Sequence, residues 1–205
     1  AVVKIQAQVA ELTADRNDRQ HALRQVLAGA DRASRVLEQL LRLARLDPLA
    51  SLPHRGEIDL AELAQRVTAE TNRGLDTRTI RLKTGDSPLL VSGDAELLEI
   101  VLRNLIDNAL RYTPPDSTIT VFARRQHGEL SLGVADDGPG VAPEELPRLV
   151  ERFYRGREAS AEGSGLGLAI AQRIAELHAA RFEVENLGGG GFEARLRWCC
   201  RSPVV

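Results

Sequence analysis

The residue pattern of this chain changes abruptly at LDPLASLPHRGEID, residues 46–59. Before this segment the pattern is helical apart from one polar break, and after it helices and strands alternate. Pro48, Pro53 and Gly56 punctuate the segment, and proline cannot continue a helix. The chain must therefore fold as two parts. We predict four segments in order: a helical hairpin over 1–46, a linker over 47–58, an α+β domain over 59–199 and a tail over 200–205.

The first part carries a long apolar seam. After a polar break at TADRNDR (13–19), apolar and small residues recur with spacing 4-3-4-3-4-3 from Leu23 to Ala44, which makes three heptads. Two helices cannot bury a stripe this wide between themselves, whereas a dimeric four-helix bundle can. We therefore expect a homodimer. A hairpin packed on the rest of its own chain is the alternative.

In the second part, segments with the apolar periodicity of a helix alternate with segments that have the periodicity of a strand. Asp59 and Asp94 can each cap a helix, and the apolar–polar alternation on either side of His127-Gly128 indicates a β-hairpin. The sum is an antiparallel or mixed sheet with helices on one face, an α+β sandwich. The expected helices cover 60–72, 94–112, 143–150 and 165–178, and the expected strands cover 79–84, 89–92, 117–126, 129–136, 180–186 and 191–198.

Composition and motif content argue against several classes of protein. The chain has 205 residues, a net charge of −2 and a pI near 6.2, so it offers no basic surface for nucleic acid or an anionic membrane. No apolar run approaches the ~20 residues that span a bilayer. Cys199 and Cys200 are adjacent and poorly placed to bridge each other, which favours a reducing compartment. A GxxxxGK[ST] phosphate loop is absent, as is a GxGxxG segment directly after a first strand.

The helix expected over 94–112 has two stripes. One is apolar and should pack on the sheet: Leu98, Leu102, Leu105, Ala109 and Tyr112. The other contains Asn104, Asn108 and Arg111, spaced i, i+4, i+7. Amide oxygens are hard ligands suited to Mg²⁺, and a guanidinium suits phosphate oxygens. An ordinary exposed polar face explains the second stripe equally well.

Two glycine segments follow. In VADDGPGV (134–141) a strand delivers Asp136 beside Gly138 and Gly140, so a carboxylate lies where backbone can approach a ligand closely. Such a carboxylate can accept a hydrogen bond from the amine of adenine. A plain Gly-Pro turn is the alternative.

The second segment, GSGLGLAI, begins at Gly163 and leads into a helix. Free N–H groups at such a helix start can cradle phosphate, and the small residues AEGSG before it suit a mobile lid. A flexible loop joined to a helix is the alternative here.

The ordered set of motifs resembles the ATP-binding domain of the gyrase, heat-shock chaperone, histidine kinase and mismatch-repair superfamily. Within it, the chain resembles a bacterial sensor histidine kinase. RNLIDNALRYTP is similar to the N box, VADDGPGV to the first glycine box, ERFYRG (151–156) to the F box and GSGLGLAI to the second glycine box. LEQLLRLARLDP resembles the end of the dimerisation hairpin. The resemblance implies a Bergerat-type sandwich after a dimerisation hairpin, with ATP and Mg²⁺ as cofactors.

The resemblance also implies residue roles. Asn108 is expected to ligate Mg²⁺ with Asn104 beside it, Arg111 to contact phosphate and Tyr112 to lie against the nucleotide. Asp136 is expected to accept from the adenine amine, and Phe153 and Arg155 to belong to the lid. The remaining ATP-binding positions that it implies are Gly138, Gly140, Gly163, Gly165, Leu166 and Gly167.

The phosphoacceptor motif of that family, similar to HE[LF]R[ST]P, is not in this sequence. The opening AVVKIQAQVA resembles the residues just after it, so the acceptor is expected shortly before Ala1. None of the four histidines replaces it: His21 lacks the following Glu and Pro, His54 is in the linker, His127 is at a turn and His178 ends a helix as a cation. We therefore assign no catalytic residue, and expect ATP binding without autophosphorylation.

The function that the resemblance implies is transfer of the γ-phosphoryl of Mg-ATP to a histidine and onward to a response-regulator aspartate. The implied parent is an inner-membrane protein of which this is a cytoplasmic segment with no membrane contact of its own. An ATPase or serine kinase of the same superfamily is one alternative. A non-catalytic nucleotide-binding dimerisation scaffold is another.

Overall fold

The computed structural model describes residues 5, 7–8, 10, 15–46, 51–75, 78–85, 88–156 and 163–199. The chain divides into two compact units, Ala1–Arg45 and Leu46–Val205. Each unit is described by itself below. None of the described helices is both long and apolar enough to cross a membrane.

The first unit is dominated by helix α2, Arg16–Leu46. Asp15 caps it, since its Oδ1 accepts hydrogen bonds from the backbone N–H groups of Asn17 (2.7 Å) and Asp18 (3.0 Å). The helix thus begins inside the polar run that we predicted as a break, because an aspartate followed by polar residues makes a good first turn. Leucines of the predicted seam stay exposed, with Leu27 at 64% and Leu41 at 59%. Most of the helix predicted before the break lies outside the described residues.

The second unit contains a five-stranded mixed sheet with strand order β2-β4-β5-β7-β6. Its strands are β2 (Ile80–Thr84), β4 (Ile119–Gln126), β5 (Glu129–Asp136), β6 (Arg181–Asn186) and β7 (Phe192–Cys199). Strands β2 and β4 are parallel and all other neighbours are antiparallel. The predicted strands and the turn at His127-Gly128 are all present, and the predicted α+β class is confirmed.

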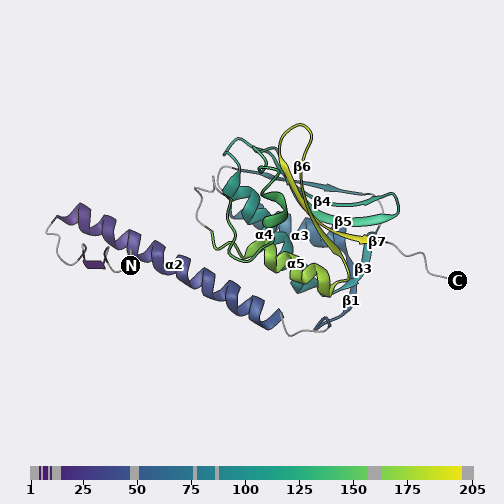
Figure 1. The fold of residues 1–205 in the computed structure, drawn as a ribbon, viewed down its shortest axis with the longest axis horizontal. Helices are drawn as coiled ribbons and strands as arrows, with labels where there is room; N and C mark the ends of the chain where they lie inside the picture. The colour runs from purple at the N-terminus through teal and green to yellow at the C-terminus, as the bar shows by residue number, and fades with distance from the viewer. Residues whose placement is uncertain are drawn as a thin grey trace. The chain divides into compact units, whose positions relative to one another are not determined.

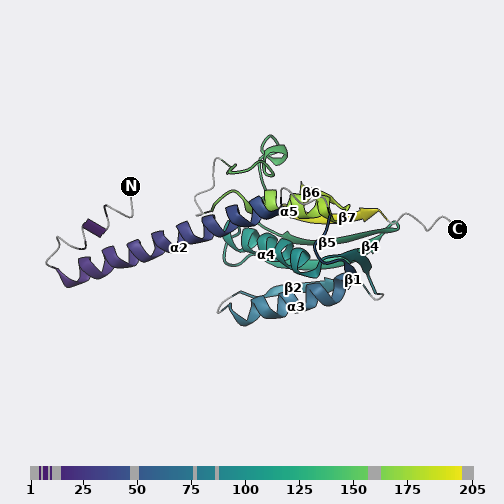
Figure 2. The same ribbon diagram turned by 90° about the horizontal axis from the view of Figure 1, so that it is seen from below.

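Three helices cover one face of this sheet (Figures 1 and 2). They are α3 (Leu60–Arg73), α4 (Ala95–Tyr112) and α5 (Gly167–Leu177), close to the predicted ranges. The core forms where their apolar stripes meet the alternate residues of the strands. Its largest fully buried side chains include Leu60, Leu98, Leu102, Ile106, Leu132, Ile170, Ile174 and Leu196.

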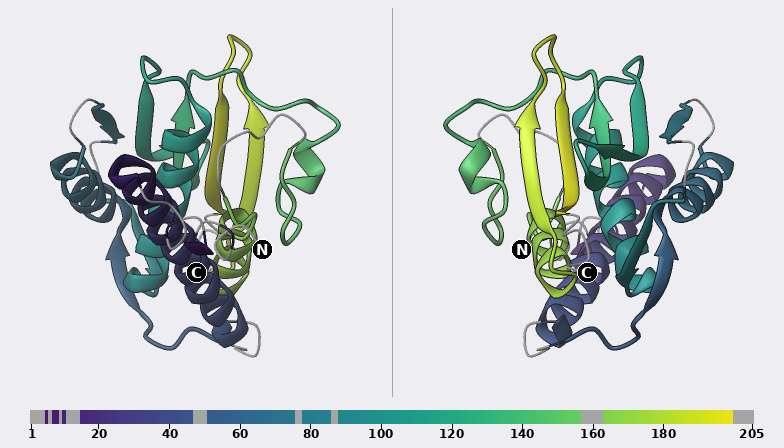
Figure 3. Two further views of the ribbon diagram at one scale, coloured as in Figure 1. Left: turned by 90° about the vertical axis from the view of Figure 1, so that its left-hand side faces the viewer. Right: turned by 90° about the vertical axis from the view of Figure 1, so that its right-hand side faces the viewer.

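Two details differ from the prediction. A short strand β1 (Gly56–Asp59) pairs antiparallel with β3 (Leu90–Gly93), although proline and glycine hide it in the sequence. The helix expected over 143–150 is reduced to a 3-10 helix at Leu146–Arg148. Pro147 lacks the N–H that an α-helical turn needs, so only a tighter turn forms. Figure 3 shows the chain after β5 passing the β6–β7 hairpin on the outer side of β6.

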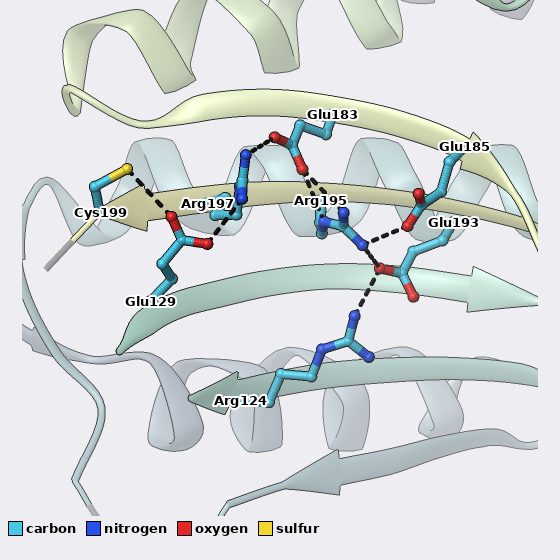
Figure 4. Close-up of polar contacts among 8 residues, drawn as sticks. All are labelled: Arg124, Glu129, Glu183, Glu185, Glu193, Arg195, Arg197 and Cys199. Carbon is cyan, nitrogen blue, oxygen red and sulfur yellow. Dashed lines mark hydrogen bonds and ion pairs between the residues drawn. The ribbon is translucent and has the colours of Figure 1, made fainter. Parts of the chain in front are cut away.

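The opposite face of the sheet is covered by a network of arginines and glutamates (Figure 4). Arg195 on β7 lies at its centre and pairs with Glu183 (2.9 Å) on β6 and with Glu193 on its own strand. Glu193 in turn pairs with Arg124 on β4 at 2.8 Å. The two faces thus differ in chemistry, and α4 and the start of α5, which carry several of the predicted site residues, lie on the helix-covered face.

Candidate functional site

The polar stripe of α4 is present as predicted. Asn104 and Asn108 are half-buried and Arg111 is exposed, while Leu98, Leu102, Leu105 and Ala109 on the other stripe are buried. Tyr112 does not pack on the sheet as we predicted: it is 41% exposed, and its Oη would lie 3.1 Å from a Cβ at Gly163. The Nδ2 atom of Asn104 is buried without a hydrogen-bond partner. A buried donor without a partner is costly, so this amide calls for an acceptor that the described residues do not supply.

Asp136 lies at the end of β5, between Ile119 of β4 and Phe192 of β7. Burial raises the pKa of its carboxyl above the ordinary value, although N–H groups of Gly138 and Phe192 oppose the shift. The Gly138 N–H donates to Asp136 Oδ1 at 3.0 Å. A side chain at Gly191 would collide with the backbone carbonyl of Asp136, so the turn between β6 and β7 packs directly against this position.

Gly138 joins the first glycine segment to the end of α4. A Cβ at Gly138 would lie 2.8 Å from Thr113 Cγ2, one residue beyond the helix. Gly140 has a positive φ of 74° and packs against Asn186. The Asn186 side chain accepts from the N–H of Val141 (2.9 Å) and donates to the Val141 carbonyl (2.6 Å), which fixes the turn at the end of β6.

The second glycine segment approaches the same helix end. A Cβ at Gly163 would lie 3.0 Å from Arg111 Nη1 and 3.1 Å from Tyr112 Oη. Further along, a Cβ at Gly167 would lie 3.8 Å from the Cβ of Asn104, where α5 begins. Leu166 is fully buried and anchors this start. The first N–H groups of α5 therefore open beside the polar stripe of α4, where they suit an anion.

The F-box segment packs on the second glycine segment. The Phe153 N–H donates to the Gly165 carbonyl at 2.9 Å, and a Cβ at Gly165 would lie 2.7 Å from the carbonyl carbon of Phe153. Gly165 has a φ of 69°, so glycine is required there both for conformation and for space. Phe153 is 58% exposed, and Arg155 is also exposed. The predicted lid AEGSG lies partly outside the described residues.

The structure thus brings the three motifs together around the C-terminal half of α4. Asn104, Arg111 and Tyr112 meet the second glycine segment, and the first glycine segment meets the helix end through Thr113. Thr113, Arg78 and Asn186 support this arrangement, although the motifs did not predict them. Thr113 belongs to the RYTP motif, so its position beside the site could be predicted from the sequence. Arg78 and Asn186 act on distant segments, and nothing local signals them.

The residues fit a triphosphate with a bound divalent ion. The unpartnered donor of Asn104, the Arg111 guanidinium and the N–H groups of α5 all suit phosphate oxygens. Within the described ranges, no group of three or more His, Cys, Asp and Glu side chains could hold a metal ion. A Mg²⁺ at Asn108 would therefore share its coordination with phosphate oxygens and water, as Mg²⁺ in nucleotide sites does.

Comparison with known proteins gives a consistent result. The family model described as "Histidine kinase-, DNA gyrase B-, and HSP90-like ATPase" matches residues 93–201. Sensor protein QseC of Salmonella typhi is 43% identical over 201 residues, which cover 97% of this chain and 44% of QseC. Sensor protein kinase PmrB of Pseudomonas aeruginosa is 37% identical over 198 residues, covering 96% of this chain and 42% of PmrB. The chain spans less than half the length of these relatives.

Among solved structures, the cytoplasmic segment of histidine kinase QseC is 33% identical, with a TM-score of 0.57. The match covers 82% of this chain and 93% of that one. The likeness therefore extends over both the sequence motifs and the arrangement of the strands and helices.

Proposed function

Because this chain belongs to the histidine kinase-, DNA gyrase B- and HSP90-like ATPase family, we propose that it is the nucleotide-binding core of a bacterial sensor histidine kinase. The intact kinase would transfer the γ-phosphoryl of Mg-ATP to a histidine and then to a response-regulator aspartate. One observation carries this proposal: Gly163 lies against Arg111 and Tyr112, while Gly138 lies against Thr113 of the same helix end. Segments far apart in the sequence thus meet where one nucleotide would bind.

Each residue has a role in this proposal. Asp136 accepts the amine hydrogen bond of adenine, with Gly138 and Gly140 shaping that wall. Asn108 ligates Mg²⁺, which would neutralise charge on the phosphate oxygens. Asn104 and Arg111 bind phosphate. The remaining assigned positions line or cover the nucleotide: Tyr112, Phe153, Arg155, Gly163, Gly165, Leu166 and Gly167.

The proposal extends to partners and location. Four leucines of α2, at positions 23, 27, 37 and 41, are each about half exposed or more in the single chain, which suits burial in a homodimer. The response regulator would be the phosphoryl acceptor. The parent protein would be anchored in the inner membrane with this segment in the cytoplasm. We propose no nucleic-acid partner.

The alternatives are less favoured. An ATPase, a serine kinase or a non-catalytic scaffold would not require similarity to sensor kinases over nearly the whole chain, helical part included. Since the sequence contains no HE[LF]R[ST]P motif, we propose that this chain binds ATP but does not phosphorylate itself.

Calorimetry with Mg-ADP tests the proposal. Asp136→Asn and Asn108→Asp should each weaken binding by roughly 10- to 100-fold. Asp136→Asn removes the charge from the group that accepts from the adenine amine, whereas Asn108→Asp places a negative charge beside the phosphate oxygens. The exposed turn variant Asp116→Asn is the matched control and should bind as the parent does. Unchanged affinity in both site variants, with circular dichroism showing intact folds, would contradict the site assignment.

A further inference from the structure

Arg78, just before β2, reaches across to the C-terminal end of α4. Its Nη1 donates to the carbonyl of Leu110 at 2.8 Å, and its Nη2 donates to Thr113 Oγ1 and to the Pro114 carbonyl, each at 2.6 Å. The last carbonyls of a helix have no partner within it, and the helix dipole is negative there. A guanidinium with three bonds at this point therefore fixes where α4 ends.

Thr113 passes this constraint to the first glycine segment. Its hydroxyl accepts from Arg78 and donates to the Ala109 carbonyl at 2.7 Å, so the side-chain orientation is set from both sides. Its methyl group Cγ2 then faces Gly138, 2.8 Å from where a Cβ would stand. Gly138 in turn donates to Asp136 Oδ1 at 3.0 Å.

We propose that Arg78 is a positioning residue for base recognition, acting through Thr113 and Gly138 on the Asp136 carboxylate. The inference rests on the proposed function, in which Asp136 accepts the adenine amine. Arg78 itself would not touch the nucleotide. Its guanidinium holds Thr113, Thr113 limits the position of the Gly138 turn, and that turn orients the carboxylate.

A purely structural anchor would lower stability alone, so the useful readout is discrimination between bases. Hypoxanthine carries a carbonyl oxygen where adenine carries its amine, and a carboxylate repels it. If Arg78 orients Asp136, loss of the Arg78 guanidinium should weaken the binding of ADP more than that of IDP. The preference for ADP over IDP should therefore shrink. A loss of stability by itself would weaken the binding of both nucleotides equally.

The experiment measures dissociation constants of Mg-ADP and Mg-IDP by calorimetry on the full 205-residue chain. Arg78→Gln should weaken ADP by about fivefold to tenfold and IDP by less than about twofold. Thr113→Val keeps the shape but removes the hydroxyl, and should act in the same direction. The double variant should add little to either single variant, since both break one chain of contacts. Arg81→Gln, exposed on β2, is the matched control and should change neither constant.

An unchanged ADP-to-IDP ratio in folded Arg78→Gln overturns the inference, and thermal unfolding establishes the folded state. If Arg78→Gln does not fold, the ratio in Thr113→Val decides alone. The two proposals fail in different ways. A parent chain that binds no ADP overturns both. A parent that prefers ADP, with a preference lost in Asp136→Asn, upholds the proposed function and leaves Arg78 to be judged on its own variant.

Discussion

The two ends of α4 use polar groups in different ways. At the N-terminal end, Asp94 is buried and its carboxylate accepts from the N–H groups of His54, Glu96 and Leu97. His178 is buried beside it, with Nε2 accepting from the Asp94 N–H at 2.9 Å. In the C-terminal half, Asn104 keeps a buried amide without a partner, and Arg111 and Tyr112 are exposed.

The difference separates a structural junction from the proposed binding site on one helix. Where the chain satisfies its own polar groups, the contacts serve the fold. Where it leaves the Asn104 donor without a partner among the described residues, beside a glycine-lined backbone, the proposed nucleotide would complete the contacts. Changes at the first end should therefore alter stability, and changes at the second end should alter affinity.

The largest expected effect is at Asp94. Asp94→Ala removes three accepted hydrogen bonds at the start of α4 and should lower the free energy of unfolding by about 3 kcal/mol. Urea unfolding measures this loss, and calorimetry on the folded variant should give an unchanged affinity for ADP. Glu96→Ala, exposed in the first turn, is the control. A strong loss of affinity in folded Asp94→Ala would break the comparison.

A matched pair of glycine variants sharpens the comparison between the two ends of α4. Gly93→Ala would place a Cβ 2.6 Å from Cδ2 of the buried His178 ring and should destabilise the fold by roughly 1–3 kcal/mol. Among the described residues, the added Cβ of Gly163→Ala meets the ends of the Arg111 and Tyr112 side chains, which can move, so the melting temperature should not change. Affinity for ADP should nevertheless fall about fivefold, because the added methyl group stands where backbone must approach phosphate. Equal melting shifts in the two variants would contradict this division.

The smallest expected effect is a pH dependence at the junction. Nδ1 of His178 donates to the Ile174 carbonyl at 2.8 Å while Nε2 accepts, so the ring is neutral and not the cation predicted from the helix end. Burial lowers its pKa below the ordinary 6.5, against the pull of the nearby Asp94. The unfolded chain takes up this proton first, so the stabilisation is complete above pH 6.5 and is lost as pH falls from there toward the lowered pKa.

Thermal unfolding across this range should show the melting temperature falling with acidification. His178→Gln should be less stable and should lose this part of the slope. The control is His127→Gln at the exposed β4–β5 turn, which should keep the slope of the parent. An identical slope in parent and His178→Gln would assign the titration to another group.

Much of the fold could be predicted because its signals are local. Asp94 caps α4 as its sequence position indicates, and the β4–β5 hairpin turns at His127-Gly128, where both residues have positive φ. The approach of the three motifs was predicted from resemblance. The supporting contacts could not be predicted, because Arg78 and Thr113 are 35 positions apart and Asp94 and His178 are 84 apart. Such pairs are determined by tertiary packing, and no periodicity in either segment predicts them.

The outermost strands of the sheet have a further consequence. Within the part of the chain that the structure describes, strands β2 and β6 each pair with one neighbouring strand, so the backbone groups on their outer edges are not used by this sheet. Arg81 and Lys83 are exposed on β2, and Arg181 and Glu185 are exposed on β6. Charges along a free edge disfavour intermolecular sheet extension. The charged side chains on β2 and β6 should therefore keep the domain soluble at concentrations at which edge-to-edge aggregation would otherwise begin.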